Sequence, residues 1–206
     1  MSNQIGSVVA SGPRWATVTR STRETQITVT LKLDGSGETK IETGVGFFDH
    51  LLNSLAHHAL FDLEVVAAGD LVIDEHHTVE DVALVLGAAL AEALGDRAGI
   101  VRFGDAAVPM DESVATVVVD VGGRPYAVVD LPFRGKRAGK MPLQLIDHVL
   151  ESFARSGGVT LNVRGRGRND HHLAEAAFKA LGRSLRAAVA VDPRRSGAAS
   201  TKGSLG

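Results

Sequence analysis

The chain has 206 residues, which is enough for one or two domains with a sizeable core. Hydrophobic residues make up 44% of it and charged residues 22%, a mixture typical of globular rather than disordered proteins. The formal net charge of −2 argues against a nucleic-acid binder that relies on a basic surface. Because the sequence contains no cysteine, it excludes a disulfide framework, a thiolate metal site and a cysteine nucleophile.

The sequence indicates neither a secretory signal nor a membrane segment. Its first residues lack a basic region followed by an apolar one. No apolar run reaches the roughly 18 residues that a membrane helix needs. We therefore expect a cytoplasmic protein with no membrane or nucleic-acid partner, and we expect flexible ends at residues 1–13 and 193–206.

In the first half the pattern predicts two strands, a helix, a further strand and a long helix. Alternating apolar residues at 27, 29, 31 and 33 end at the turn Asp34-Gly35, which indicates the first strand of a hairpin. The second strand of this hairpin is predicted at 39–42. An amphipathic helix around 48–55, a strand at 63–67 and a helix from about His76 follow.

The same order of elements returns in the second half. Alternating residues at 117, 119 and 121 end at a Gly-Gly turn, followed by a strand at 125–131. A helix around 143–153, a strand at 159–163 and a helix from about His171 come next, and the basic segment Arg134–Lys140 is expected to be a solvated loop. The predicted fold class is α+β: two similar sheet-and-helix halves, residues 14–100 and 101–192, packed as one unit.

The clearest internal repeat lies in the histidines. Six of the eight belong to a pattern, Asp-His followed downstream by His-His-x-x-Glu, that occurs twice. The first copy joins Asp49-His50 to His76–Glu80, and the second joins Asp147-His148 to His171–Glu175. Two copies of such a pattern are hard to explain by surface chemistry alone, so we interpret them as metal sites.

The spacing within each copy favours shared ligands. Residues i and i+4 of a helix lie on one face, so the first histidine and the glutamate of each copy can bind the same ion. Adjacent side chains point about 100° apart, so the second histidine has to serve a different ion or none. A pseudo-twofold arrangement is the simplest, although not the only, way to use all eight ligands. Its two sets are His50, His77, His171 and Glu175 at one ion, and His76, Glu80, His148 and His172 at the other.

Three imidazoles and one carboxylate without thiolates suit manganese, iron, zinc, cobalt or nickel. Four protein ligands leave positions on an octahedral ion open for substrate and water, which is the arrangement of a catalytic site. We expect neighbouring carboxylates to orient the imidazole rings. The adjacent candidates are Asp49, Asp74, Asp147 and Asp170.

Four segments of the chain resemble the imidazoleglycerol-phosphate dehydratase family of histidine biosynthesis. They are GFFDHLL at 46–52, DEHHTVED at 74–81, NDHHLAEA at 169–176 and STKG at 200–203. The resemblance implies a duplicated fold of the ribosomal protein S5 domain 2-like type and a homo-oligomer, a 24-mer, with two Mn²⁺ ions in each active site between subunits. It also implies a hydro-lyase that converts D-erythro-imidazoleglycerol phosphate to imidazole acetol phosphate.

The resemblance also implies roles for single residues. The family's metal ligands coincide with the two sets given above. Glu24 matches a glutamate that lies at the substrate, and Glu175 is a second carboxylate near the chemistry; which of them is the catalytic base stays open. Residues 193–206 correspond to a substrate-binding tail. The implied substrate contacts are Glu24, His50, His58, His76, Arg102, Arg124, His171, Lys179, Ser200 and Lys202.

Two other functions remain open on the residues alone. A dinuclear hydrolase also uses histidine and carboxylate ligands, although it usually has bridging aspartates. A metal-storage shell would explain the many ligands and their symmetry, but it would explain neither Glu24 nor the Ser-Thr-Lys-Gly tail. Glu112, the second-half counterpart of Glu24, is expected to have a structural role only.

Overall fold

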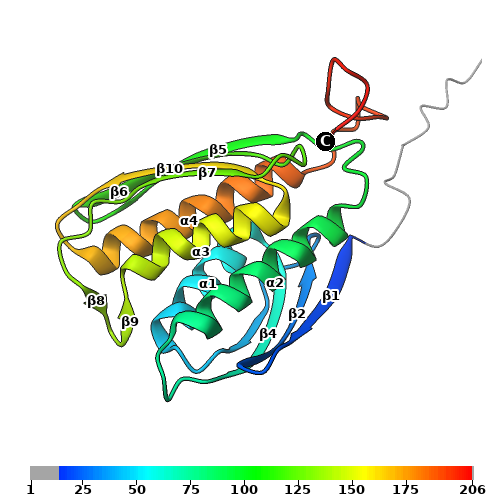
Figure 1. Cartoon of the computed structure of the whole chain (residues 1–206). Helices are drawn as coiled ribbons and strands as arrows, with labels where there is room; N and C mark the ends of the chain where they lie inside the picture. The colour runs from blue at the N-terminus through cyan, green and yellow to red at the C-terminus, as the bar shows by residue number, and fades with distance from the viewer. Residues whose placement is uncertain (1–13, 206) are drawn as a thin grey trace, which may run out of the picture.

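A computed structural model describes residues 14–205 (Figure 1), so the expected flexible N-terminus at 1–13 lies outside the described residues. The elements of the first half are β1 (Trp15–Ser21), β2 (Thr25–Lys32), β3 (Thr39–Glu42), α1 (Gly46–Ala59), β4 (Asp62–Gly69) and α2 (His76–Leu94). Those of the second half are β5 (Phe103–Met110), β6 (Ser113–Asp120), β7 (Tyr126–Asp130), β8 (Arg137–Ala138), β9 (Met141–Pro142), α3 (Gln144–Gly157), β10 (Thr160–Arg166) and α4 (Asp170–Val189).

The two halves have the same topology. Strand order is β1-β2-β4-β3 in the first sheet and β5-β6-β10-β7 in the second. In each sheet the first three strands pair antiparallel, and the last pair, β4 with β3 or β10 with β7, is parallel. The predicted duplicated α+β fold is confirmed.

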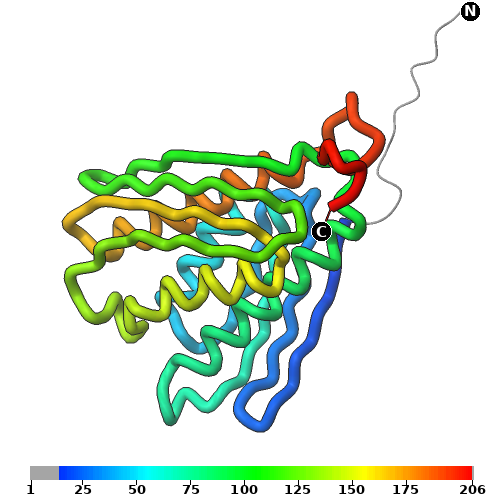
Figure 2. The backbone as a smooth tube through the Cα atoms, turned by 45° about the horizontal axis from the view of Figure 1, so that its top comes forward, coloured from blue at the N-terminus to red at the C-terminus, as the bar shows by residue number. Residues whose placement is uncertain are grey.

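The four helices lie between the two sheets (Figures 1 and 2). Helix α1 packs against α4, and α2 packs against α3, so each contact joins the two halves. Alternate strand residues and one stripe of each helix therefore enter a single hydrophobic core, in which Phe48 and Phe178 are almost completely buried. Among the described residues, no helix is both long and apolar enough to cross a membrane.

Glycines at the helix crossings allow the two halves to approach closely. A Cβ atom at Gly182 of α4 would collide with the carbonyl oxygen of Leu55 in α1. A Cβ atom at Gly87 of α2 would collide with the carbonyl oxygen of Phe153 in α3. Both crossings thus depend on a missing side chain, because core packing leaves no room for an additional methyl group.

The predicted hairpin between 27–33 and 39–42 is wrong. Strand β2 instead forms a hairpin with the preceding strand β1, and β3 lies on the far side of β4. The carboxylate of Asp62, at the start of β4, accepts hydrogen bonds from the backbone N–H groups of Ser36 and Glu38. These bonds hold the connection as it crosses the end of β4. The second half repeats this arrangement with β5, β6 and β7.

The edge strands β1 and β5 were not predicted from the sequence. Strand β1 buries Ala16 and half-buries Val18, while its other side chains are exposed, so it carries little apolar alternation. Strand β5 contains Gly104 and Pro109, which weaken a strand pattern. The basic segment 134–140 is exposed as expected except at Ala138, which the short β8–β9 ribbon buries.

Candidate active site

The first two turns of α2 and α4 carry the two His-His-x-x-Glu segments. Helix α4 begins here because the side chain of Asn169 accepts hydrogen bonds from the backbone N–H groups of His171 and His172. Before α2, the Asp74 carboxylate accepts the N–H of His76 in the same way. Adjacent rings on these turns are nearly perpendicular, with interplanar angles of 84° in α2 and 87° in α4. The adjacent imidazoles therefore diverge, as the helical spacing predicts.

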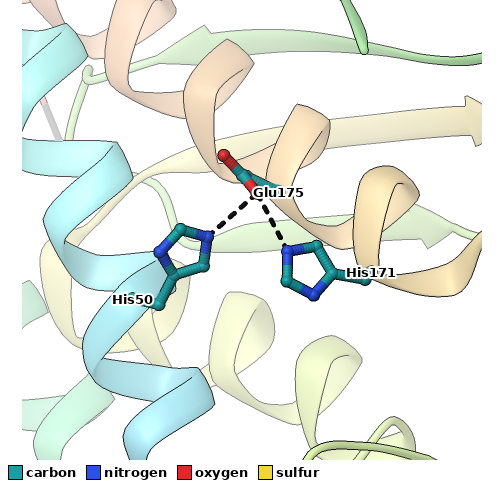
Figure 3. A group of neighbouring side chains, drawn as sticks. All are labelled: His50, His171 and Glu175. Atoms are coloured by element: carbon teal, nitrogen blue, oxygen red, sulfur yellow. Dashed lines mark hydrogen bonds and ion pairs between the residues drawn. The ribbon is translucent and has the colours of Figure 1, made fainter. Parts of the chain in front are cut away.

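The first cluster joins α1 to the start of α4 (Figure 3). His50 Nε2 lies 2.9 Å from Glu175 Oε2, and His171 Nε2 lies 3.1 Å from the same oxygen. The two imidazole rings are 5.5 Å apart between centroids. Glu175 is buried, whereas both histidines are exposed. Two ring nitrogens and one carboxylate thus converge at an opening to solvent.

The second cluster is the pseudo-symmetric counterpart on α2 and α3. His148 Nε2 lies 3.2 Å from Glu80 Oε1, and His76 Nε2 lies 3.5 Å from Glu80 Oε2. The rings of the two histidines are 4.9 Å apart between centroids. In each cluster the three ligand atoms lie within 4.8 Å of one another. Each cluster also takes residues from both halves of the chain.

Both carboxylates are ionised at neutral pH. Burial opposes ionisation of Glu175, but hydrogen bonds from Lys179 and His50 outweigh it and bring the pKa down to about 2. Burial likewise opposes ionisation of Glu80, and the hydrogen bond and charge of His148 outweigh it, so this pKa is also below its usual range. Convergent imidazole nitrogens beside an anionic carboxylate are a donor set that fits a divalent transition metal.

The fourth histidine of each predicted set lies elsewhere in the chain. His77 Nδ1 is 2.9 Å from Asp70 Oδ2 and 3.9 Å from Glu24 Oε2. His172 Nδ1 is 3.0 Å from Glu112 Oε2. Within the described part of one chain, His77 instead forms a third group with Glu24 and Asp70, and neither His77 nor His172 joins the three-residue cluster of its predicted set. One chain therefore brings together three of the four ligands in each predicted set.

The predicted orienting carboxylates are not the ones that contact the rings. Among residues 14–205, Asp49 accepts hydrogen bonds from Thr43, Asp74 accepts one from a backbone N–H, Asp170 accepts two, and Asp147 has a buried Oδ1 without a partner. Asp70 and Glu112 contact imidazoles instead. Sequence reasoning missed Asp70 because its distance from His77 depends on how the chain turns between β4 and α2.

Two predicted substrate contacts border the first cluster. Lys179 Nζ lies 2.7 Å from Glu175 Oε1, one helical turn further along α4. Burial lowers the pKa of His58, and the charges of His57, Lys179 and Arg183 lower it further. The neutral form of the His58 imidazole is therefore favoured beside Lys179 and Arg183.

Four predicted substrate contacts line one cavity at the other end of the molecule. Arg102, Arg124, Ser200 and Lys202 surround a volume of about 360 Å³. The Arg102 guanidinium donates two hydrogen bonds to Asp120 and one to the carbonyl oxygen of Ala199 in the C-terminal segment. The pairing with Asp120 raises the pKa of Arg102, so the cation is permanent. Cations beside a hydroxyl suit a phosphate group.

The cavity and the first cluster lie at opposite ends of α4. The backbone N–H of Arg102 donates to the carbonyl oxygen of Ala188, near the end of the helix, whereas His171 lies in its first turn. These positions are about 25 Å apart along the helix axis. Figure 1 shows the C-terminal segment beside the last turn of α4, remote from its start.

The chain is thus a duplicated α+β protein with a pair of candidate metal centres. These centres are the two pseudo-symmetric histidine–carboxylate clusters, and the cationic cavity is separate from the first of them. The family model described as imidazoleglycerol-phosphate dehydratase matches residues 43–185. Because this match covers more than half of the chain, the chain belongs to the imidazoleglycerol-phosphate dehydratase family.

Individual relatives agree with this assignment. The imidazoleglycerol-phosphate dehydratase of Methanoculleus marisnigri is 55% identical over 192 residues, which cover 93% of this chain and 100% of the relative. That of Chloroflexus aurantiacus is 52% identical over 205 residues, covering 98% and 100%. The crystal structure of the Staphylococcus aureus dehydratase is 32% identical with a TM-score of 0.79, covering 86% of this chain and 99% of that one. The Pyrococcus furiosus structure is 34% identical with the same score, covering 91% and 100%.

Proposed function

We propose that the chain dehydrates D-erythro-imidazoleglycerol phosphate in active sites that neighbouring copies complete, each with two Mn²⁺ ions. Membership of the family makes the chain a hydro-lyase of histidine biosynthesis, with imidazole acetol phosphate as product. The metal identity and a 24-subunit assembly come from the family resemblance. A place in amino-acid biosynthesis also favours the cytoplasm as its location.

The separation of the first cluster from the phosphate cavity is the observation that carries the shared site. The substrate has only three carbons between its imidazole and its phosphate, so it cannot span about 25 Å. One copy therefore supplies the metal-binding end and another supplies Arg102, Arg124, Ser200 and Lys202, with residues 193–206 as the substrate-binding tail. If neighbouring copies share each site, His77 and His172 of one copy can supply the fourth ligand to clusters on its neighbours.

The residues that would hold the ions are the two predicted sets of four, now divided between copies. Within one chain, His50, His171 and Glu175 form most of one set, and His76, Glu80 and His148 form most of the other. When bound, the ions would supply Lewis acidity that polarises the substrate imidazole.

The two candidate bases differ in their surroundings, and the difference favours Glu24. The reaction breaks one C–H bond and one C–O bond, so a carboxylate must take a proton from carbon. Glu175 is hydrogen-bonded to Lys179 and His50, and its pKa of about 2 makes it a weak base. The Glu24 side chain is 58% exposed and accepts no hydrogen bond among the described residues. We assign proton abstraction to Glu24 and metal binding to Glu175.

Mixed assemblies test the shared site. Glu24→Gln removes the base, Lys202→Ala removes a phosphate contact, and each variant alone should be nearly inactive. After dissociation and joint reassembly of equal amounts, about a quarter of the sites would combine an intact base with an intact cavity, because each part comes from either variant at random. Activity should then return to about that fraction of wild type.

A matched pair provides the control for this experiment. Arg124→Ala and Lys202→Ala damage the same cavity, so their mixture should stay inactive. Native mass spectrometry checks that both mixtures contain hybrid particles. Hybrid particles of the first pair without any recovered activity would contradict a site shared between copies.

A further inference from the structure

The imidazoles that diverge from the clusters, His77 and His172, are held by carboxylates from different positions in the two halves. In the second half the carboxylate belongs to Glu112, in the turn between β5 and β6. In the first half it belongs to Asp70, directly after β4. The two halves thus use carboxylates at different positions to orient equivalent imidazoles, although their topology is the same.

Strand register shows that these positions face each other across the sheet. Gly69 pairs with Thr25, so Asp70 follows opposite Glu24. Arg166 pairs with Val114, and two residues further along Arg168 stands opposite Glu112. Each half therefore has one glutamate in the hairpin turn and one residue beyond the central strand. In the first half the latter is an aspartate, and in the second it is an arginine.

In the second half the glutamate is fully engaged. Glu112 accepts hydrogen bonds from the backbone N–H groups of Arg168 and Asn169 at 2.9 and 2.7 Å, and from Ser113 Oγ at 2.9 Å. It also contacts His172 Nδ1 at 3.0 Å. An arginine side chain has no acceptor, so Arg168 cannot accept a hydrogen bond from an imidazole N–H, and Glu112 is the carboxylate that contacts His172. Glu112 has no freedom left for chemistry on a substrate.

In the first half the orienting contact has moved to the aspartate. Asp70 Oδ2 is 2.9 Å from His77 Nδ1, while Glu24 stays 3.9 Å from the same nitrogen. The Asp70 side chain is half-buried, and its Oδ1 is buried without a partner among the described residues. The imidazole of His77 is therefore its principal partner.

We propose that Asp70 is a positioning residue that holds His77 for metal binding and thereby leaves the Glu24 carboxylate free to react. An ionised carboxylate can only accept a hydrogen bond, so Nδ1 of His77 carries the proton and the lone pair is on Nε2. A fixed tautomer and ring orientation strengthen an imidazole as a metal ligand. This inference rests on the proposed function, because it gives Glu24 and His77 their roles there.

Titration of the metal-free protein with Mn²⁺, without substrate, tests the proposal. Asp70→Ala should weaken one of the two classes of Mn²⁺ site by about 10- to 100-fold, the usual cost of losing such a partner, and leave the other class unchanged. Asp70→Asn keeps an acceptor oxygen and should show a smaller loss. Glu24→Gln is the matched control from the opposite position on the sheet, and its Mn²⁺ affinities should equal those of wild type.

Rescue separates the two residues in a second measurement. Excess Mn²⁺ should restore most of the turnover of Asp70→Ala, whereas it should not restore Glu24→Gln. Unchanged Mn²⁺ affinities in both Asp70 variants would overturn the proposal, as would a loss confined to Glu24→Gln. If Asp70→Ala fails to fold, the comparison of Asp70→Asn with Glu24→Gln decides. Because the titration uses no substrate, it is independent of whether the dehydratase assay succeeds.

Discussion

The different surroundings of Glu24 and Glu175 favour the two different tasks that we propose for these carboxylates. Glu175 lies in the second turn of α4, where burial raises its pKa but the contacts with Lys179 and His50 lower it by more. Glu24 lies in an exposed turn between β1 and β2. The first arrangement suits a permanent anionic ligand, and the second suits a group that exchanges protons.

The first prediction follows for Glu24. Glu24→Gln should lower kcat by at least about 100-fold, because an amide cannot take the proton. The metal content of the purified protein, measured by elemental analysis, should stay at the wild-type level. Loss of metal in this variant would mean that Glu24 is a ligand rather than a base.

A second prediction concerns the stability of the first half in acid. The backbone N–H of Ser36 is the main reason that the pKa of Asp62 falls to about 2, with further contributions from Lys32 and the N–H of Glu38 that outweigh burial. Because the folded pKa lies below the ordinary value, this contribution to stability is present above about pH 4 and is lost as pH falls towards 2.

Asp62→Asn tests this contribution. The variant should be less stable than wild type at pH 7 by on the order of 1 kcal/mol, since the site is near solvent and partly screened. Denaturant unfolding of the metal-free protein measures the difference. The difference should shrink at pH 2–3, and a difference that does not change with pH would contradict the assignment.

The relative positions of two residues could be predicted from the sequence where both lie on one helix. The spacing of His171 and Glu175, or of His76 and Glu80, predicts a shared face, and the structure brings each pair together. The orienting carboxylates were not predictable in this way. Asp70 reaches His77 only because β4 ends beside the first turn of α2, a relation that depends on tertiary structure.

At the scale of elements, the sequence pattern predicted the helices and the central strands well. The strand pairing predicted from it was incorrect. Apolar alternation in β2 and β6 indicates central strands, because both are buried on one face. It does not show which neighbour each strand takes. The crossing of the chain over β4 depends on hydrogen bonds from a turn to Asp62, and their partners are 24 and 26 residues away in the chain.

The helix crossings provide the third prediction. Gly182→Ala should destabilise the folded protein by about 1–3 kcal/mol, because the methyl group meets the Leu55 carbonyl across the α1–α4 contact. Gly46→Ala, at the first residue of α1, is the matched control, since a Cβ atom there has no neighbour within 4 Å. Thermal unfolding compares the two. Equal stability of the variants would contradict close packing at this crossing.

At the scale of the whole molecule, each half alone lacks a complete set of ligands. His50 of the first half meets the helix of the second, and His148 of the second half meets the helix of the first. The duplication was therefore readable in the sequence as two copies of one histidine pattern. The proposed association of chains could not be predicted from the residues in this way, because it would depend on surfaces for which the sequence carries no comparable repeat. Only the family resemblance implies it.

The fourth prediction is that metal binding and assembly are coupled. If His77 and His172 complete clusters on neighbouring copies, chelation removes ligand bonds between subunits and should weaken the assembly. Light scattering should report a smaller mean mass after metal removal, and added Mn²⁺ should restore the large particle. An unchanged particle after complete chelation would count against ligands shared between copies.

The central claim is that the paired clusters are catalytic centres of a dehydratase. The most direct measurement is turnover of imidazoleglycerol phosphate by metal-stripped protein, with and without added Mn²⁺. We expect formation of imidazole acetol phosphate that depends on Mn²⁺ and reaches a plateau when two ions per chain are bound. No product at full metal occupancy would contradict the account and would favour a hydrolase or metal-storage function for the same clusters.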